Sequence, residues 1–168
     1  MINRYGTHLK LLLKAVEATK GDVLELGIGA SSTPALHRLC AYQGRRLDSY
    51  DTDAHYVDQY SRQYQSELHT YVWVNDWDKA KIDRPWSVVL IDHKPAIRRR
   101  VDAVRLKDWA EYIVIHDTEP EIDRFYRFAS IFPRFKYVFH DGQIPRTSVV
   151  SNKHELDWLK GDNNGNGD

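Results

Sequence analysis

The stretch VLELGIGASSTP, residues 23–34, decides the fold of this chain. Its apolar first part predicts a strand, which runs directly into a turn of small residues containing Gly27 and Gly29. Thr33 and Pro34 then fit the N-cap and the first position of a helix. A turn of this kind lets a ligand approach the backbone at the carboxyl edge of a parallel sheet. The stretch therefore predicts an α/β fold with a cofactor site at the turn.

Strand-like and helix-like patterns alternate on both sides of this stretch. Strands are predicted at 22–26, 46–51, 70–74, 86–91 and 112–116, and helices at 34–42, 55–68, 96–106 and 121–132. An amphipathic helix carrying Leu9, Leu12, Leu13 and Val16 precedes them. Such alternation indicates parallel strands joined by right-handed crossovers with helices on both faces.

The C-terminal part has a different pattern. Segments 135–139 and 148–151 flank the turn-rich stretch 141–145, which predicts an antiparallel hairpin. Residues 161–168 offer no apolar side chain and are expected to form a flexible tail. We therefore expect a single Rossmann-like α/β domain over residues 1–160, with a mostly parallel sheet that ends in an antiparallel hairpin.

Composition limits the possible partners. The 168 residues include 24 basic and 24 acidic ones, so the balanced charge disfavours nucleic acid as a partner. The single cysteine, Cys40, lies in an apolar helical pattern and indicates a buried thiol and a cytoplasmic protein. No apolar run is long enough to cross a membrane. Little sequence remains for a substrate lid, so a second subunit in a homo-oligomer is one way to complete the site.

The glycine turn resembles the first motif of class I S-adenosylmethionine-dependent methyltransferases, in which an acidic residue stands two positions before the first glycine. The resemblance implies that S-adenosylmethionine is the cofactor. Because Ser32 occupies the place of the third glycine of dinucleotide-binding proteins, a pyrophosphate-bearing cofactor is the second choice.

The same resemblance assigns the cofactor-binding residues. Asp51 would hold the ribose hydroxyls, Asp76 would accept from the adenine amino group, and Trp77 would cover the base. Asp53 is expected to cap a helix. The implied cofactor-binding set is Glu25, Gly27, Gly29, Ser31, Ser32, Asp51, Thr52, Asp76 and Trp77.

Two polar clusters follow the fourth and fifth predicted strands and should meet beside the cofactor. The first contains Asp92, His93 and Lys94, and the second contains His116 and Asp117. They are similar to the small-molecule O-methyltransferases related to catechol O-methyltransferase. That likeness makes Asp92 and Asp117 candidate magnesium ligands and Lys94 a candidate general base.

The second cluster departs from this family because a histidine, His116, replaces the first acid. Imidazole suits zinc, iron or nickel better than magnesium. Without a metal, His93 or His116 would act as the base. The three arginines at 98–100 are expected on the solvated side of a helix whose buried stripe holds Ile97, Val101 and Val104.

These observations lead to one functional prediction and two alternatives. The prediction is an enzyme that transfers a methyl group from S-adenosylmethionine to a hydroxyl of a small molecule or sugar. The first alternative is an enzyme that cleaves S-adenosylmethionine or transfers another group from it. The second is a non-catalytic nucleotide-binding scaffold.

Overall fold

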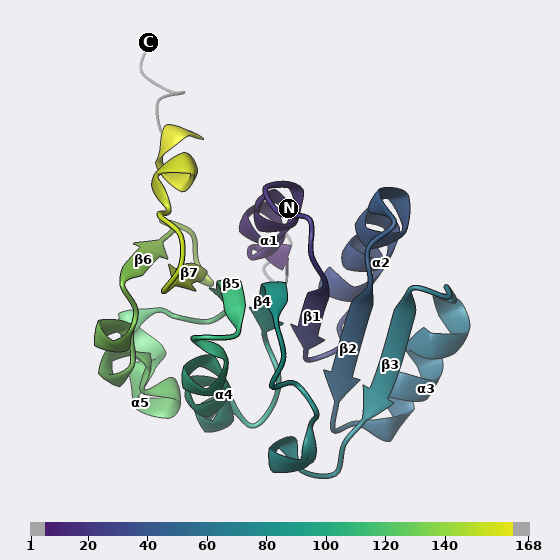
Figure 1. Ribbon diagram of the computed structural model, residues 1–168. Helices are drawn as coiled ribbons and strands as arrows, with labels where there is room; N and C mark the ends of the chain where they lie inside the picture. The colour runs from purple at the N-terminus through teal and green to yellow at the C-terminus, as the bar shows by residue number, and fades with distance from the viewer. Residues whose placement is uncertain (1–5, 163–168) are drawn as a thin grey trace.

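The computed structural model describes residues 6–162, and they form an α/β fold around one seven-stranded sheet (Figure 1). The strands are β1 (Val23–Leu26), β2 (Leu47–Asp51), β3 (His69–Trp73), β4 (Trp86–Ile91), β5 (Ala110–Ile115), β6 (Tyr137–His140) and β7 (Ser148–Ser151). Their order in the sheet is β3-β2-β1-β4-β5-β7-β6. Strands β1 to β5 are parallel, and β7 is antiparallel to both β5 and β6. The predicted fold class is confirmed.

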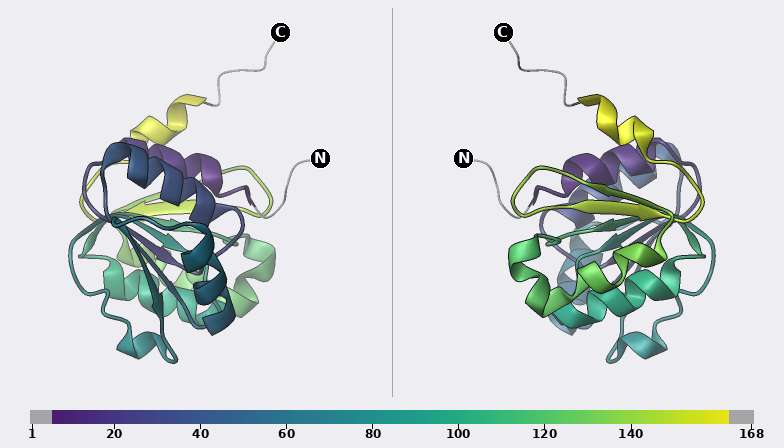
Figure 2. Two further views of the ribbon diagram at one scale, coloured as in Figure 1. Left: turned by 90° about the vertical axis from the view of Figure 1, so that its right-hand side faces the viewer. Right: turned by 90° about the vertical axis from the view of Figure 1, so that its left-hand side faces the viewer.

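Helices cover the two faces of the sheet, as Figure 2 shows. The α-helices are α1 (Leu9–Glu17), α2 (Ser32–Gln43), α3 (Ala54–Gln63), α4 (Arg99–Leu106) and α5 (Asp123–Tyr126). Short 3-10 helices include η2 (Trp77–Lys79), η3 (Ala96–Arg98), η4 (Pro120–Ile122), η5 (Phe128–Ser130), η6 (Phe132–Arg134) and η7 (Asp157–Asp162). Between residues 6 and 162, no helix combines the length and apolar character needed to span a bilayer.

The central strands β1 and β4 are buried along their whole length, and most of their residues are apolar. All six residues of β4 are buried, as expected for an inner strand of a parallel sheet. One core lies between the sheet and α4, where Ala103 and Leu106 meet Ile113. The other core lies under α1 and α2, and it includes Cys40, whose predicted burial is confirmed.

The sheet order places a cleft beside β1. Strands β2 and β3 lie on one side of β1 in the sheet, and β4 and β5 lie on the other side. The order of the strands therefore reverses between β1 and β4. In open α/β sheets, ligands bind at the carboxyl ends of the strands at such a point.

Three predicted helices differ from the structure. The helix expected at 55–68 is shorter, because α3 ends at Gln63 and Tyr64 is its C-cap. The helix expected at 121–132 is wrong, because the segment breaks into η4, α5, η5 and η6. The break falls at Arg127, whose φ of 56° is left-handed and ends α5. The helix expected at 96–106 begins as the 3-10 turn η3 and becomes α-helical only at Arg99.

Thr33 is not the N-cap of α2. The helix starts two residues earlier than predicted, at Ser32, with Ser31 in the cap position. Thr33 instead turns its hydroxyl toward Glu25. Of the predicted tail at 161–168, residues 161 and 162 end η7, and 163–168 lie outside the described residues.

Candidate functional site

Gly27 makes the bend after β1 possible. Its φ is 103°, and a Cβ placed there would lie 2.7 Å from backbone atoms of both Asp92 and His93. No L-residue fits this conformation and this space without strain. The bend therefore lies directly against the chain that leaves β4, which joins the two halves of the site.

Glu25 supports the bend from below. The side chain is fully buried and accepts hydrogen bonds from the hydroxyls of Thr33 (2.9 Å) and Ser49 (2.6 Å). The Thr33 hydroxyl oxygen in turn accepts from the backbone N–H of Gly29 (2.9 Å). Burial raises the pKa of Glu25 from 4.5 to about 7. Glu25 therefore positions the loop and has no exposed surface with which to bind a ligand.

Asp51, at the end of β2, closes the other side of the bend. Its Oδ2 accepts from the backbone N–H of Ile28 (2.8 Å), and its Oδ1 accepts from that of Asp53 (2.8 Å). A carboxylate has about four lone-pair sites, so two acceptor sites stay open. Asp53 caps α3 as predicted, accepting from the backbone N–H groups of His55 and Tyr56.

A cleft of about 590 Å³ runs between these groups. Gly27, Asp51 and Thr52 line it, as the sequence suggests for a cofactor site, and so do Tyr56 and Trp73. Trp73 is 52% exposed and donates from its Nε1 to the carbonyl of Thr52. Tyr56 and Trp73 were not predicted as part of the site. The sequence around a tryptophan at the end of a strand does not indicate whether its side chain is exposed.

Asp76 and Trp77 are not part of this cleft. Asp76 caps η2 by accepting from the backbone N–H of Asp78 (3.0 Å). Trp77 is 4% exposed and donates from its Nε1 to the carbonyl of Lys94 (2.7 Å). The expectation that Trp77 covers the adenine is therefore wrong, because its ring packs in the core beneath the site.

A second pocket of about 570 Å³ adjoins the cleft, and Tyr56, Asp92 and Lys94 line both. Ser31 and Ser32 form one wall of this second pocket. The opposite wall carries His8, Asp92, Arg99, His116, Asp117 and Pro145. The two predicted polar clusters after β4 and β5 thus do meet in one place.

Arg99 joins those clusters. Its guanidinium is 2.9 Å from both Asp92 Oδ1 and Asp117 Oδ2, and it also donates to the carbonyl of His93 (2.7 Å). The arginine is 6% exposed, so the prediction that it lies on the wet side of its helix is wrong. Ile97 and Val101, predicted as buried, are the exposed residues at 40% and 44%.

The residues do not fit the expected magnesium site. Magnesium would need the carboxylates of Asp92 and Asp117 together, but Arg99 forms an ion pair with each of them. The Tyr126 hydroxyl also donates to Asp117 (3.1 Å). A cation shared by these two acids would have to displace the guanidinium.

His93 borders the cofactor cleft, but its side chain has no exposed surface there. The imidazole is completely buried, and its Nε2 lies 2.9 Å from Asp102 Oδ2 on α4. Burial, together with the charges of Arg98 and Arg99, lowers the pKa of His93 overall, although Asp102 raises it. The prediction of His93 as a general base is wrong, because its ring points into the protein.

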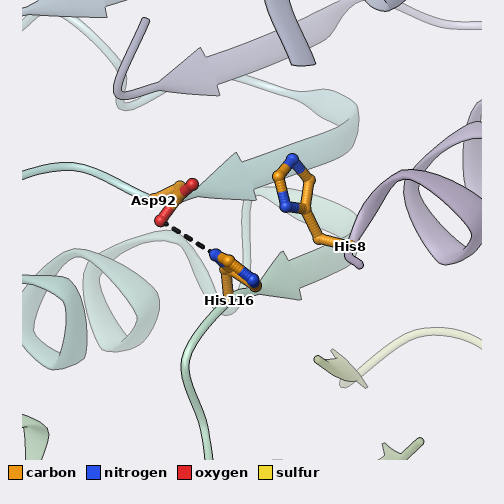
Figure 3. Close-up of side chains that lie close together, drawn as sticks. All are labelled: His8, Asp92 and His116. Atoms are coloured by element: carbon orange, nitrogen blue, oxygen red, sulfur yellow. Dashed lines mark hydrogen bonds and ion pairs between the residues drawn. The ribbon is translucent and has the colours of Figure 1, made fainter. Parts of the chain in front are cut away.

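His116 and His8 face each other across the end of β5. Figure 3 shows the His8 ring beside the Asp92–His116 pair. His116 Nδ1 is 3.3 Å from Asp92 Oδ1, and the two imidazole centroids are 4.6 Å apart. Burial lowers the pKa of His116, but Asp92 and Asp117 outweigh it and raise the pKa overall. Burial lowers the pKa of His8 to about 4. His8 was not predicted, since it precedes the first helix and belongs to no motif.

The chain is similar in structure to solved methyltransferases. The N-methyltransferase NodS from Bradyrhizobium japonicum WM9 has a TM-score of 0.62 at 11% identity, over 85% of this chain and 91% of that one. An RNA methyltransferase from Salinibacter ruber, in complex with S-adenosyl-L-homocysteine, has a TM-score of 0.56 at 14% identity, over 88% and 93%. The hMettl16 catalytic domain, in complex with the MAT2A 3′UTR hairpin 1, has a TM-score of 0.60 at 10% identity, over 86% and 69%.

No family model and no curated protein matches the sequence. The likenesses show that the chain has the fold of the class I methyltransferases. At such low identity they show the fold alone.

Proposed function

We propose that this chain is an S-adenosylmethionine-dependent methyltransferase, with its cofactor in the cleft between the Gly27 bend and Asp51. The observation that carries the proposal is the pairing of Asp51 with the backbone N–H of Ile28. It fixes a carboxylate beside a glycine bend that leaves room for a ligand, and two of its acceptor sites remain for ribose hydroxyls. S-adenosyl-L-homocysteine, the ligand in the Salinibacter ruber structure, has the same adenosyl group as S-adenosylmethionine.

Bound S-adenosylmethionine supplies an electrophilic methyl group on its sulfonium. The residues of this chain do the remaining work. Gly27 leaves space at the bend and Gly29 lines the adjoining second pocket. Asp51 and Thr52 hold the sugar, and Trp73 and Tyr56 are the aromatic groups available for the base. Ser31 and Ser32 close the side that leads to the second pocket.

The second pocket would hold the acceptor, which we propose is a hydroxyl of a small molecule or sugar. Arg99 keeps the Asp92 and Asp117 carboxylates in place and neutralises part of their charge. Lys94 is exposed at the junction of the two pockets, which makes it the candidate to take the proton from the acceptor hydroxyl. His116 Nε2 lies 3.1 Å from the Thr7 hydroxyl and its Nδ1 lies 3.3 Å from Asp92 Oδ1.

Cofactor calorimetry with S-adenosylmethionine tests the first step. The parent chain should bind it, and Asp51→Ala should weaken binding at least tenfold, on the order of the 1.5–3 kcal/mol given by a hydrogen bond to a charged group. Asp58→Ala is the matched control, because the exposed Asp58 carboxylate of α3 pairs with Arg62 and lines neither pocket. A parent chain that does not bind the cofactor overturns the proposal.

Acceptor screening with labelled cofactor tests the second step. Small hydroxyl compounds and sugars should be labelled, and Lys94→Met should lower kcat with little change in KM. RNA belongs in the same screen, because a protein of this fold has been solved with an RNA hairpin. Labelling of RNA alone would overturn the small-molecule acceptor while leaving methyl transfer intact. The cytoplasmic location and the homo-oligomer stay predictions.

A further inference from the structure

Three side chains of metal-ligand type meet on the wall of the second pocket. They are His8, which precedes α1, Asp92, which follows β4, and His116, which follows β5 (Figure 3). One ligand atom from each lies within 4.8 Å of the others. Two imidazoles and one carboxylate are a set of ligands that binds divalent transition metals.

The first observation that points to an ion is the state of His8. The residue is 1% exposed, and both of its ring nitrogens are buried without a hydrogen-bond partner among residues 6–162. A buried imidazole normally satisfies its nitrogens, since a polar group without a partner costs free energy. Figure 3 shows one of these nitrogens turned toward Asp92 and His116.

The second observation comes from the hydrogen bonds of His116. The Thr7 hydroxyl donates to the carbonyl of Pro145 (2.8 Å), so its oxygen must accept from His116 Nε2–H (3.1 Å). That bond leaves the lone pair of a neutral His116 on Nδ1, which faces Asp92 Oδ1 at 3.3 Å. Two electron-pair donors facing each other need a positive group between them, either a proton or a metal ion.

We infer that His8, Asp92 and His116 bind one divalent transition-metal ion of the zinc, cobalt or iron class. Two ligands that are each about 2.1 Å from a metal ion stand about 3.0–3.4 Å apart, which matches the 3.3 Å between His116 and Asp92. The ligand atoms now lie within 4.8 Å of one another, so the His8 ring needs to move inward by up to about 1.4–1.8 Å to complete the site. A proton on His116 would satisfy the Asp92 contact but would leave both nitrogens of His8 without a partner.

The charges around the three ligands suit a cation. Asp92 and Asp117 carry two negative charges and Arg99 one positive charge, which leaves one net negative charge beside the two imidazoles. Arg99 pairs with the same Asp92 oxygen, Oδ1, that faces His116, so the metal ion would use the second lone pair of that oxygen and would not take the place of Arg99 between the two acids. Thr7 would hold the His116 ring through its second nitrogen, the arrangement that usually orients a metal-binding histidine. This site differs from the expected magnesium site in its ligands, and it does not depend on the proposed function.

Cobalt titration of the chelator-treated full chain tests the inference, because bound Co²⁺ gives visible absorption bands. The parent should bind a single ion. His8→Gln and His116→Gln should each weaken Co²⁺ binding by on the order of a hundredfold, and Thr7→Val by about tenfold. His37→Gln is the control, because His37 and His69 form the other close histidine pair, with their Nδ1 atoms 3.1 Å apart. Circular dichroism confirms that each variant is folded.

Three results would overturn the metal site. The first is the absence of Co²⁺ absorption bands in the parent. The second is Co²⁺ binding to folded His8→Gln that is as tight as binding to the parent. The third is competition by Mg²⁺ at a concentration equal to that of Co²⁺. Cofactor calorimetry on the same chelator-treated protein keeps this outcome separate from that of the proposed function. Cobalt binding without S-adenosylmethionine binding overturns only the methyltransferase proposal, and the reverse result overturns only the metal site.

Discussion

Replacing Gly27 with alanine should destabilise the protein more than any other glycine-to-alanine change in the site. Two effects act together at this position. The φ of 103° is strained for an L-residue, at a cost of about 1–3 kcal/mol. The added methyl would also lie 2.7 Å from the Asp92 and His93 backbone. Forcing atoms into packed space costs a further amount of about 1–3 kcal/mol. The expected loss is about 2–6 kcal/mol.

Two other glycines separate these effects in urea unfolding experiments. Gly44 also has a left-handed φ of 65° but nothing within 4 Å of its Cβ position, so Gly44→Ala should cost only about 1–2 kcal/mol. Gly29 has no positive φ and its nearest neighbour is the Ser32 hydroxyl at 3.8 Å, so Gly29→Ala should change stability by less than about 0.5 kcal/mol. If Gly27→Ala loses no more stability than Gly44→Ala, the close approach of the bend to β4 is refuted.

Three further predictions concern stability. The pKa of Glu25 is raised from 4.5 to about 7, so its protonated form favours the fold. Stability should therefore fall by about 3 kcal/mol as pH rises from 4.5 to 7. Urea unfolding of Glu25→Gln across that range should lack this component, and an equal fall in the variant would contradict it. Arg99→Gln leaves two carboxylates without their ion pair and should cost on the order of 3 kcal/mol. Arg62→Gln, at a 77% exposed side chain, should cost less than about 1 kcal/mol, and a similar loss in both would contradict the role of Arg99. Asp53→Ala removes the cap of α3 and should lower the thermal midpoint through a loss of about 1 kcal/mol, so an unchanged midpoint would count against that cap.

The strands were predictable because their apolar runs are bounded by turn residues. The predicted strand 86–91 matches β4, and the segment 148–151 matches β7. The polar residues that follow parallel strands were also predictable as neighbours, since all parallel strands end at one edge. Asp51, Asp92 and Asp117 therefore lie at the edge where the sequence places them.

The exposed position predicted for the arginines at 98–100 assumes one regular helix over 96–106. The 3-10 turn η3 changes the angle between successive residues before α4 begins. Side chains that seemed to share an apolar stripe, such as Ile97 and Val101, thus turn outward. The prediction from apolar spacing also takes no account of charge. Arg99 is buried because it pairs with Asp92 and Asp117, which lie on two other loops.

His8 and Trp73 were missed for another reason. Neither stands in a local pattern that specifies its tertiary neighbours. His8 reaches the site because α1 packs across β4 and β5. Trp73 lines the cleft because it ends β3, and whether such a side chain faces a ligand or the core depends on packing that a single sequence does not state.

The first helix and the last turn share one apolar cluster, in which Leu11 and Leu12 of α1 join Leu159 of η7 and Leu156, which precedes η7. Between that turn and β7 lies Lys153, exposed to solvent and open to trypsin. Cleavage after Lys153 would separate Leu156 and Leu159 from the rest of the chain. The apolar face of α1, which begins one residue after His8, would then be exposed to solvent. Cleavage near the C-terminus would in this way alter the packing of the helix that positions the His8 imidazole.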